Sequence, residues 1–142
     1  MLDIQEVSTL LKDFCINSPN IAAVYLFGSY SDGAANPKSD LDLAILFKED
    51  IDLREELALQ VQLSEAVRFE AIDLLNLNKA PLLMQFKVIS SGCLIYEADS
   101  DMTSDFLEDI FQRYHDQEYR FRVFFQEWDE GLGENYQIGK PR

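Results

Sequence analysis

Two aspartates, Asp40 and Asp42, stand two residues apart at the start of a short apolar segment that spans residues 40–47. If this segment is a β-strand, its side chains alternate between two faces, so both carboxylates lie on one face and Leu41 and Leu43 on the other. Two neighbouring anions cost free energy unless a cation neutralises them, and hard oxygen ligands at this spacing suit Mg²⁺. Such a pair is also common at solvated strand ends, so alone it does not establish a metal site.

A glycine–serine turn precedes the pair. Gly28 and Ser29 follow the apolar segment 21–27 (IAAVYLF), and ten residues separate Ser29 from Asp40. Glycine lets the backbone approach a phosphate closely, and the serine hydroxyl and the following amides can donate hydrogen bonds to it. The turn therefore predicts a phosphate site that faces the metal ligands across adjacent strand ends.

A third acid, Asp73, lies between Ile72 and Leu74 in the segment 71–77 (AIDLLNL). An acid among the hydrophobic residues of a strand is costly to bury without a partner. It could instead be an edge-strand aspartate that faces water. The presence of Asp40 and Asp42 favours a metal site that all three share.

Hydrophobic periodicity predicts the elements that position these residues. The segment 52–67 is expected to be a helix, with Leu53, Leu57, Ala58 and Val61 on one side and a capping box made by Asp52 and Glu55. The other expected elements are an amphipathic helix from Asp3 to about Ile16, strands 21–27, 40–47 and 71–77, a helix opened by Pro81 and ended by Gly92, a short edge strand 94–96, and a C-terminal helix at about 103–128 that places Phe106, Ile110, Tyr114, Phe121, Phe125 and Trp128 on about one face.

Alternating helices and strands predict an α/β (α+β) fold, with a small mixed sheet of about four strands covered by helices. The length of 142 residues and the hydrophobic content of 47% fit a single domain over 1–142, with a core at about 20–99 and a frayed tail at 131–142. No apolar run is long enough to span a bilayer, and the N-terminus is acidic where a signal peptide is basic, so we expect a cytoplasmic protein without membrane contact.

The formal net charge of −14 should repel a phosphate backbone, which argues against an independent nucleic-acid binder. A basic protein partner or divalent cations would suit this charge, although the charge could also serve only solubility. The two cysteines, Cys15 and Cys93, lack the spacing of a zinc site or a disulfide framework, and both are predicted to be buried thiols.

The segment GSYSDGAANPKSDLDLAIL matches the pattern G-S-x10-D-x-D, and with it the chain resembles the nucleotidyltransferase (DNA polymerase beta-like) superfamily. Within that superfamily it is similar to the minimal nucleotidyltransferases, and the resemblance extends over about residues 20–99. It implies the nucleotidyltransferase fold, a triphosphate bound by Gly28 and Ser29, and two Mg²⁺ ions bound by Asp40, Asp42 and Asp73.

The reaction implied by this resemblance is attack of an acceptor hydroxyl on the α-phosphate of ATP, with pyrophosphate leaving. Asp73 would ligate the second metal ion or accept the proton. Where members of this group often carry a basic residue before the loop glycine, this chain has Asp32 before Gly33. We therefore predict that nucleotide binding depends more on Mg²⁺ than on basic side chains, with Lys38 a solvated loop residue.

Minimal nucleotidyltransferases resemble the antitoxin half of toxin–antitoxin pairs, in which the antitoxin adenylylates a tyrosine of a HEPN-domain ribonuclease. A HEPN-domain toxin is therefore the expected partner. Two alternatives stay open: an antitoxin that acts by contact alone, and a transferase for small molecules of the aminoglycoside type. The last is disfavoured because the chain ends without the extra helical domain of the antibiotic-modifying enzymes.

The C-terminal helix could contact a protein partner, although core packing is the commoner role of such an aromatic face. His115, the only histidine, is expected on the surface. Arg113, Arg120 and Arg122 are expected to pair with acids on the same helix.

Overall fold

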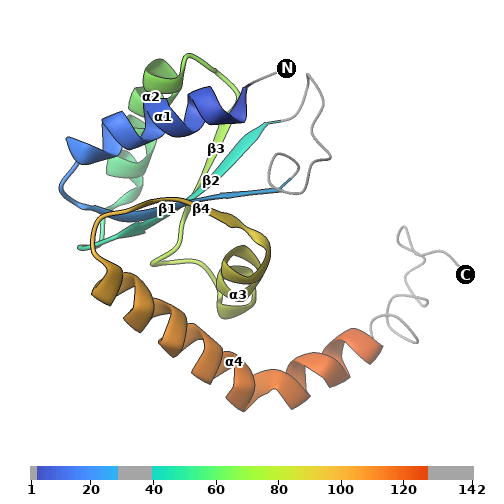
Figure 1. Cartoon of the computed structure of the whole chain (residues 1–142). Coiled ribbons are helices and arrows are strands. Elements are labelled where there is room, and N and C mark those ends of the chain that lie inside the picture. Colours follow the sequence, from blue (N-terminus) through green and yellow to red (C-terminus); the bar gives the residue numbers. More distant parts are fainter. Residues whose placement is uncertain (1–2, 29–39, 128–142) are drawn as a thin grey trace, which may run out of the picture.

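The computed structural model describes residues 3–28 and 40–127, and within them a four-stranded sheet is covered by helices on both faces (Figure 1). The predicted α/β fold with a small mixed sheet and a C-terminal helix is confirmed. The elements are, in chain order, α1 (Ile4–Ile16), β1 (Ile21–Phe27), β2 (Leu41–Phe47), α2 (Leu53–Val67), β3 (Ile72–Asn76), α3 (Leu82–Ser91), β4 (Cys93–Glu97) and α4 (Ser100–Glu127).

The strands lie in the order β3-β2-β1-β4. β1 is antiparallel to β2 and to β4, whereas β2 and β3 are parallel. A parallel pair needs a crossover connection, and α2 provides it. The short strand predicted at 94–96 is confirmed as an edge strand, and β3 forms the opposite edge.

Alternation along β2 divides its side chains between two cores. Leu41, Leu43 and Ile45 pack in a core with residues of α1 and α2. Ala44 and Leu46 pack in a second core with residues of α3 and α4. Helices therefore cover both faces of the sheet, as Figure 1 shows, and this explains why β1 is apolar at every position.

The capping box of α2 is confirmed. The backbone N–H of Glu55 donates to Asp52 Oδ1 at 2.8 Å, and the backbone N–H of Asp52 donates to Glu55 Oε1 at 3.2 Å. These two bonds satisfy donors that the first turn of a helix leaves unpaired. They fix the residue at which α2 begins, and α2 is the helix of the crossover between β2 and β3.

The two cysteines differ, and the prediction that both are buried is wrong for Cys93. Cys15 lies in the core, where burial raises the pKa of its thiol to about 12. Cys93 is exposed because it begins β4, an edge strand that has a partner strand on one side only. Gly92 just before it ends α3 as predicted, and a Cβ at this position would lie 2.5 Å from the carbonyl oxygen of Val88.

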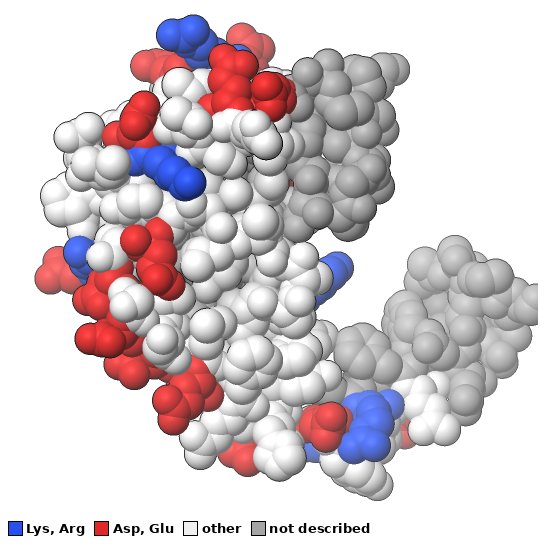
Figure 2. Space-filling model, viewed as in Figure 1, with Lys and Arg blue, Asp and Glu red and all other residues white. Residues whose placement is uncertain are grey.

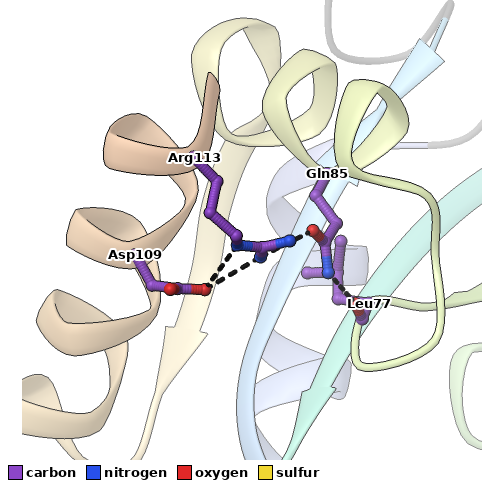
Figure 3. Close-up of polar contacts among 4 residues, drawn as sticks. All are labelled: Leu77, Gln85, Asp109 and Arg113. Carbon is purple, nitrogen blue, oxygen red and sulfur yellow. Dashed lines mark hydrogen bonds and ion pairs between the residues drawn. The ribbon is translucent and has the colours of Figure 1, made fainter. Parts of the chain in front are cut away.

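The helix α4 is attached to α3 by a polar chain that Figure 3 draws. Gln85 is 5% exposed, and its Nε2 donates to the carbonyl oxygen of Leu77 at 2.7 Å. Its Oε1 accepts from Arg113 Nη2 at 3.2 Å, and Arg113 also pairs with Asp109 at 2.8 Å. Beside this chain the ring of Phe86 stacks on that of Tyr114, with centroids 3.7 Å apart. One buried amide thus joins the end of β3, α3 and α4.

The predictions for the C-terminal helix are largely confirmed. Phe106, Ile110 and Tyr114 are wholly or partly buried, His115 is exposed, and Arg122 contacts Glu118 at 3.5 Å. Within residues 3–28 and 40–127 no ion pair of Arg120 is found. Trp128 and the tail 131–142 lie outside the described residues, as do the side chains of Phe121 and Phe125. In the part of the chain that is described, no helix is long and apolar enough to cross a bilayer.

The Gln85 amide predicts a stability effect. Gln85→Leu should lower the free energy of unfolding by about 1–3 kcal/mol, because the buried carbonyl of Leu77 and part of the Arg113 guanidinium lose their partner. Urea unfolding followed by circular dichroism measures the change. Gln62→Leu, at an exposed position of α2, is the matched control and should leave stability nearly unchanged. Equal effects of the two substitutions would contradict the role assigned to this amide.

Candidate active site

Two of the three predicted aspartates lie side by side. Asp42 on β2 is the register partner of Asp73 on β3, and side chains paired in register on parallel strands point to the same face of a sheet. Both belong to the face that Ala44 and Leu75 share with α3 and α4. Asp40 immediately precedes β2 and is exposed. The start of two neighbouring strands therefore carries a group of acids.

These carboxylates are close enough to repel one another. Burial, and then the charges of Asp73 and Asp40, raise the pKa of the Asp42 carboxyl above its usual range. Asp42 itself is partly buried, whereas Asp73 is exposed at the sheet edge. Among residues 3–28 and 40–127 no ion pair of these acids is found, and their mutual repulsion favours a positive ion beside Asp42.

Gly28 packs directly against the Asp42 carboxylate. The last residue of β1, Phe27, is the register partner of Asp42, so the turn that follows β1 lies beside the start of β2. Gly28 has a φ of +76°, and a Cβ at this position would lie 2.2 Å from Asp42 Oδ2. Only glycine fits both this backbone conformation and this space. Ser29, Asp32, Gly33 and Lys38 lie outside the described residues, so the assignment of Ser29 to nucleotide binding stays a prediction.

Comparison with known protein families shows that residues 10–101 match the family of polymerase beta nucleotidyltransferases. The chain belongs to this family. The match includes Gly28 and the three aspartates, and it agrees with the resemblance found in the sequence alone.

Named proteins are similar to this nucleotidyltransferase in sequence and structure. It is 30% identical over 100 residues to the protein adenylyltransferase MntA of Shewanella oneidensis strain MR-1. The aligned residues cover 70% of this chain and 69% of the relative. A crystal structure of a toxin–antitoxin with AMP-PNP is 27% identical, with a TM-score of 0.66 over 88% of this chain and 98% of that one. A complex of the MNT antitoxin with the tri-AMPylated HEPN toxin of S. oneidensis shares the fold, at 24% identity and a TM-score of 0.62 over 86% of this chain and 95% of that one.

The chemistry of the acids in this nucleotidyltransferase fits Mg²⁺, which prefers carboxylate and phosphate oxygens. Among the described residues, no three His, Cys, Asp or Glu side chains are gathered closely enough to hold a metal ion by themselves. Mg²⁺ is usually held by one or two carboxylates together with substrate phosphates, so a complete protein cage is not required. The roles of Asp40, Asp42 and Asp73 as metal ligands remain predictions.

A group of acidic residues on α4 lies apart from this site. Figure 2 shows acidic side chains gathered along the first half of α4, where Asp101, Asp105 and Glu108 are exposed. A hollow of about 400 Å³ near them is lined by Asp105 and, on the sheet, by Leu46 near the end of β2. Asp42 lies near the beginning of the same strand. The hollow is therefore at the other end of the sheet from the candidate active site.

Sequence reasoning missed one residue that shapes the site region. Gln60 Nε2 of α2 donates a hydrogen bond to the carbonyl oxygen of Ile72 at 2.6 Å. Ile72 is the residue just before Asp73. This bond satisfies a backbone acceptor of the edge strand and ties α2 to it. In the sequence, Gln60 is the only polar residue of the segment 57–61, which is unusual enough to suggest a specific contact. The sequence does not indicate that the contact is with Ile72.

Proposed function

We propose that this chain is an Mg²⁺-dependent adenylyltransferase that transfers AMP from ATP to a tyrosine of a HEPN-domain toxin, and so acts as the antitoxin of a toxin–antitoxin pair. The observation that carries the proposal is the placement of Asp42 beside Asp73, with the Gly28 backbone against the Asp42 carboxylate. Family membership, the adenylyltransferase relative and the related complex with AMP-PNP support it.

The proposed chemistry assigns a role to each side chain. Bound Mg²⁺ would neutralise the charge that develops on the phosphates and lower the pKa of the acceptor hydroxyl. Asp40 and Asp42 would hold the metal, and the backbone at Gly28 and Ser29 would bind the triphosphate. Asp73 is exposed, so the hydroxyl of a protein can approach it, and it would ligate metal or accept the proton.

In the transfer step the acceptor oxygen forms a bond to the α-phosphorus of ATP. The bond between the α-phosphorus and the bridging oxygen breaks, and pyrophosphate leaves with the electron pair. The proton of the hydroxyl passes to Asp73 or to solvent. We place this reaction in the cytoplasm, where ATP is available to a protein without membrane-spanning helices among its described residues.

The test is to co-express the chain with a HEPN-domain toxin and to supply ATP labelled on the α-phosphate. Label should appear on a toxin tyrosine in the presence of Mg²⁺, and chelation of Mg²⁺ should prevent it. The variant Asp40→Ala/Asp42→Ala should lose the labelling and the protection of the host while it still co-purifies with the toxin.

Two other outcomes would replace the proposal. Protection by the double-alanine variant without label would show an antitoxin that acts by contact alone. Labelling of aminoglycosides, with the toxin unlabelled, would show a transferase for small molecules.

A further inference from the structure

The strand β3 carries Asp73 and has a neighbouring strand on one side only. Just before β3, the carbonyl oxygen of Ala71 accepts from the N–H of Leu41 at 2.7 Å, so the backbone groups of Ala71 point towards β2. In a strand the backbone groups of successive residues point to opposite edges. Those of Asp73 therefore also point towards β2, whereas those of Ile72 point to the outer edge.

Two side chains of α2 contact this edge strand. Gln60 Nε2 donates to the outward carbonyl oxygen of Ile72 at 2.6 Å, and Glu56 Oε2 accepts from Asn76 Nδ2 at 3.3 Å. Glu56 and Gln60 are about one helical turn apart in α2. The residues that they contact are the first and the last of β3. The helix therefore holds both ends of the edge strand.

The position of the Asp73 carboxylate depends on the backbone that carries it. This side chain is exposed, and in the described part of the chain no hydrogen bond or ion pair of it is found. Two backbone attachments flank it: the ladder to β2 on one side, and the bond from Gln60 to the preceding residue, Ile72, on the other. Without the second bond, the start of β3 would be hydrogen-bonded to the rest of the fold mainly through β2.

We propose that Gln60 is a positioning residue for AMP transfer, which through its bond to the backbone just before Asp73 keeps that carboxylate beside Asp42. The inference rests on the proposed function and adds to it a residue outside the sequence motif. The helix α2 packs on the face of the sheet opposite to the two carboxylates, so Gln60 acts through the strand and touches no reacting group. A displacement of about 1 Å at reacting groups can cost about a hundredfold in rate, so a bond that restrains this strand can govern the rate from a distance.

The test uses Gln60→Met in the full chain. Methionine has nearly the length of glutamine and is a good helix former, but it has no N–H to donate. We expect kcat for AMP transfer to the toxin, at saturating ATP and Mg²⁺, to fall about tenfold. The KM for ATP should stay within about twofold of the wild-type value, because the turn at Gly28 that would bind the triphosphate is unchanged.

The matched control is Glu56→Met. It removes the other bond between α2 and β3, at the end of the strand away from Asp73. Both variants should lower the unfolding midpoint by similar amounts, and kcat should stay at the wild-type value in Glu56→Met. An equal fall of kcat in the two variants would mean that the rate follows the general attachment of α2, and the specific role of Gln60 would be lost. An unchanged kcat in Gln60→Met would overturn the proposal directly.

A double-mutant cycle with Asp73→Asn separates positioning from stability. If Gln60 acts through the Asp73 carboxylate, Gln60→Met should cost about tenfold in the wild type and almost nothing in the Asp73→Asn background. Single-turnover labelling of the toxin measures all four proteins. The same factor in both backgrounds would contradict the proposal, because Gln60 would then act on another part of the enzyme.

Amide hydrogen exchange of the metal-free protein gives a readout that does not need catalysis. In Gln60→Met the protection of the Asp73 N–H should fall about tenfold, whereas that of Leu77, which donates to the carbonyl oxygen of Ile45 at 2.9 Å, should be retained. Unchanged exchange at Asp73 would overturn the inference, whatever the wild type does with ATP. A wild type that transfers no AMP while the variant shows this change would refute the proposed function and leave the attachment of Asp73 by Gln60 established.

Discussion

Asp42→Asn is expected to lower the rate of AMP transfer by about a thousandfold or more, because several kcal/mol of transition-state stabilisation depend on the metal that this carboxylate would hold. Asparagine keeps the shape of the side chain beside Gly28, so the loss reports on charge rather than packing. Single-turnover labelling of the toxin at saturating ATP and Mg²⁺ measures it. Asp105→Asn, an exposed position on α4, is the matched control and should retain the wild-type rate.

The same substitution should stabilise the metal-free protein at pH 7. The pKa of Asp42 is raised in the folded chain by burial and by Asp73 and Asp40, so its ionised form opposes folding at neutral pH. This penalty disappears when the pH falls below the ordinary pKa of an aspartate, where the carboxyl is protonated in both states. The unfolding midpoint of Asp42→Asn should therefore exceed that of the wild type at pH 7, and the difference should shrink on acidification.

Mg²⁺ provides an internal control for this stability effect. Addition of Mg²⁺ should raise the unfolding midpoint of the wild type more than that of Asp42→Asn, because a ligand stabilises the state that binds it. A variant less stable than the wild type at pH 7 without metal would show that repulsion among the carboxylates is not significant.

Gly28→Ala is expected to have the second largest effect. The new Cβ would lie 2.2 Å from Asp42 Oδ2, so either the turn or the carboxylate has to move. A displacement of about 1 Å at reacting groups can cost about a hundredfold in rate, and we expect a loss of this order in kcat/KM for AMP transfer. The left-handed backbone of Gly28 adds about 1–3 kcal/mol of strain for any residue with a side chain, so the free energy of unfolding should fall as well.

A double-mutant cycle separates the two causes. The stability cost of Gly28→Ala should be smaller in an Asp42→Ala background, because the clashing oxygen is then absent, and the remainder reports the strain of the positive φ. Urea unfolding of the four proteins gives the coupling energy. If the cost is the same in both backgrounds, contact with Asp42 is not what requires glycine at this position.

Features set by local sequence were predictable. The strand 21–27 agrees with β1 at both ends, since it is a continuous apolar run bounded by Asn20 and Gly28. The capping box of α2 needed only Asp52 and Glu55, three residues apart. The alternation that places Asp42 opposite Leu41 and Leu43 follows from strand geometry alone.

Features set by contacts between distant segments were not predictable in the same way. The pairing of Asp42 with Asp73 depends on the register of two strands, which the length and packing of α2 fix. The sequence pattern of α2 has apolar residues at helical spacing on more than one side. Which side faces the core depends on where the sheet lies, and the side that carries Leu57 faces solvent. The exposure of Cys93 likewise follows from the place of β4 at an edge.

Because a crossover joins β2 to β3, the candidate active site is complete only when two segments distant in the sequence have paired. Its two neighbouring acids belong to parallel strands, and such a pair forms only across a long connection, which here contains α2. Before that pairing, a chain emerging from the ribosome contains Gly28 and Asp42 but not their neighbour Asp73. Under the proposed roles of these acids, a chain truncated before β3 would keep the motif of residues 28–42 and would lose AMP transfer.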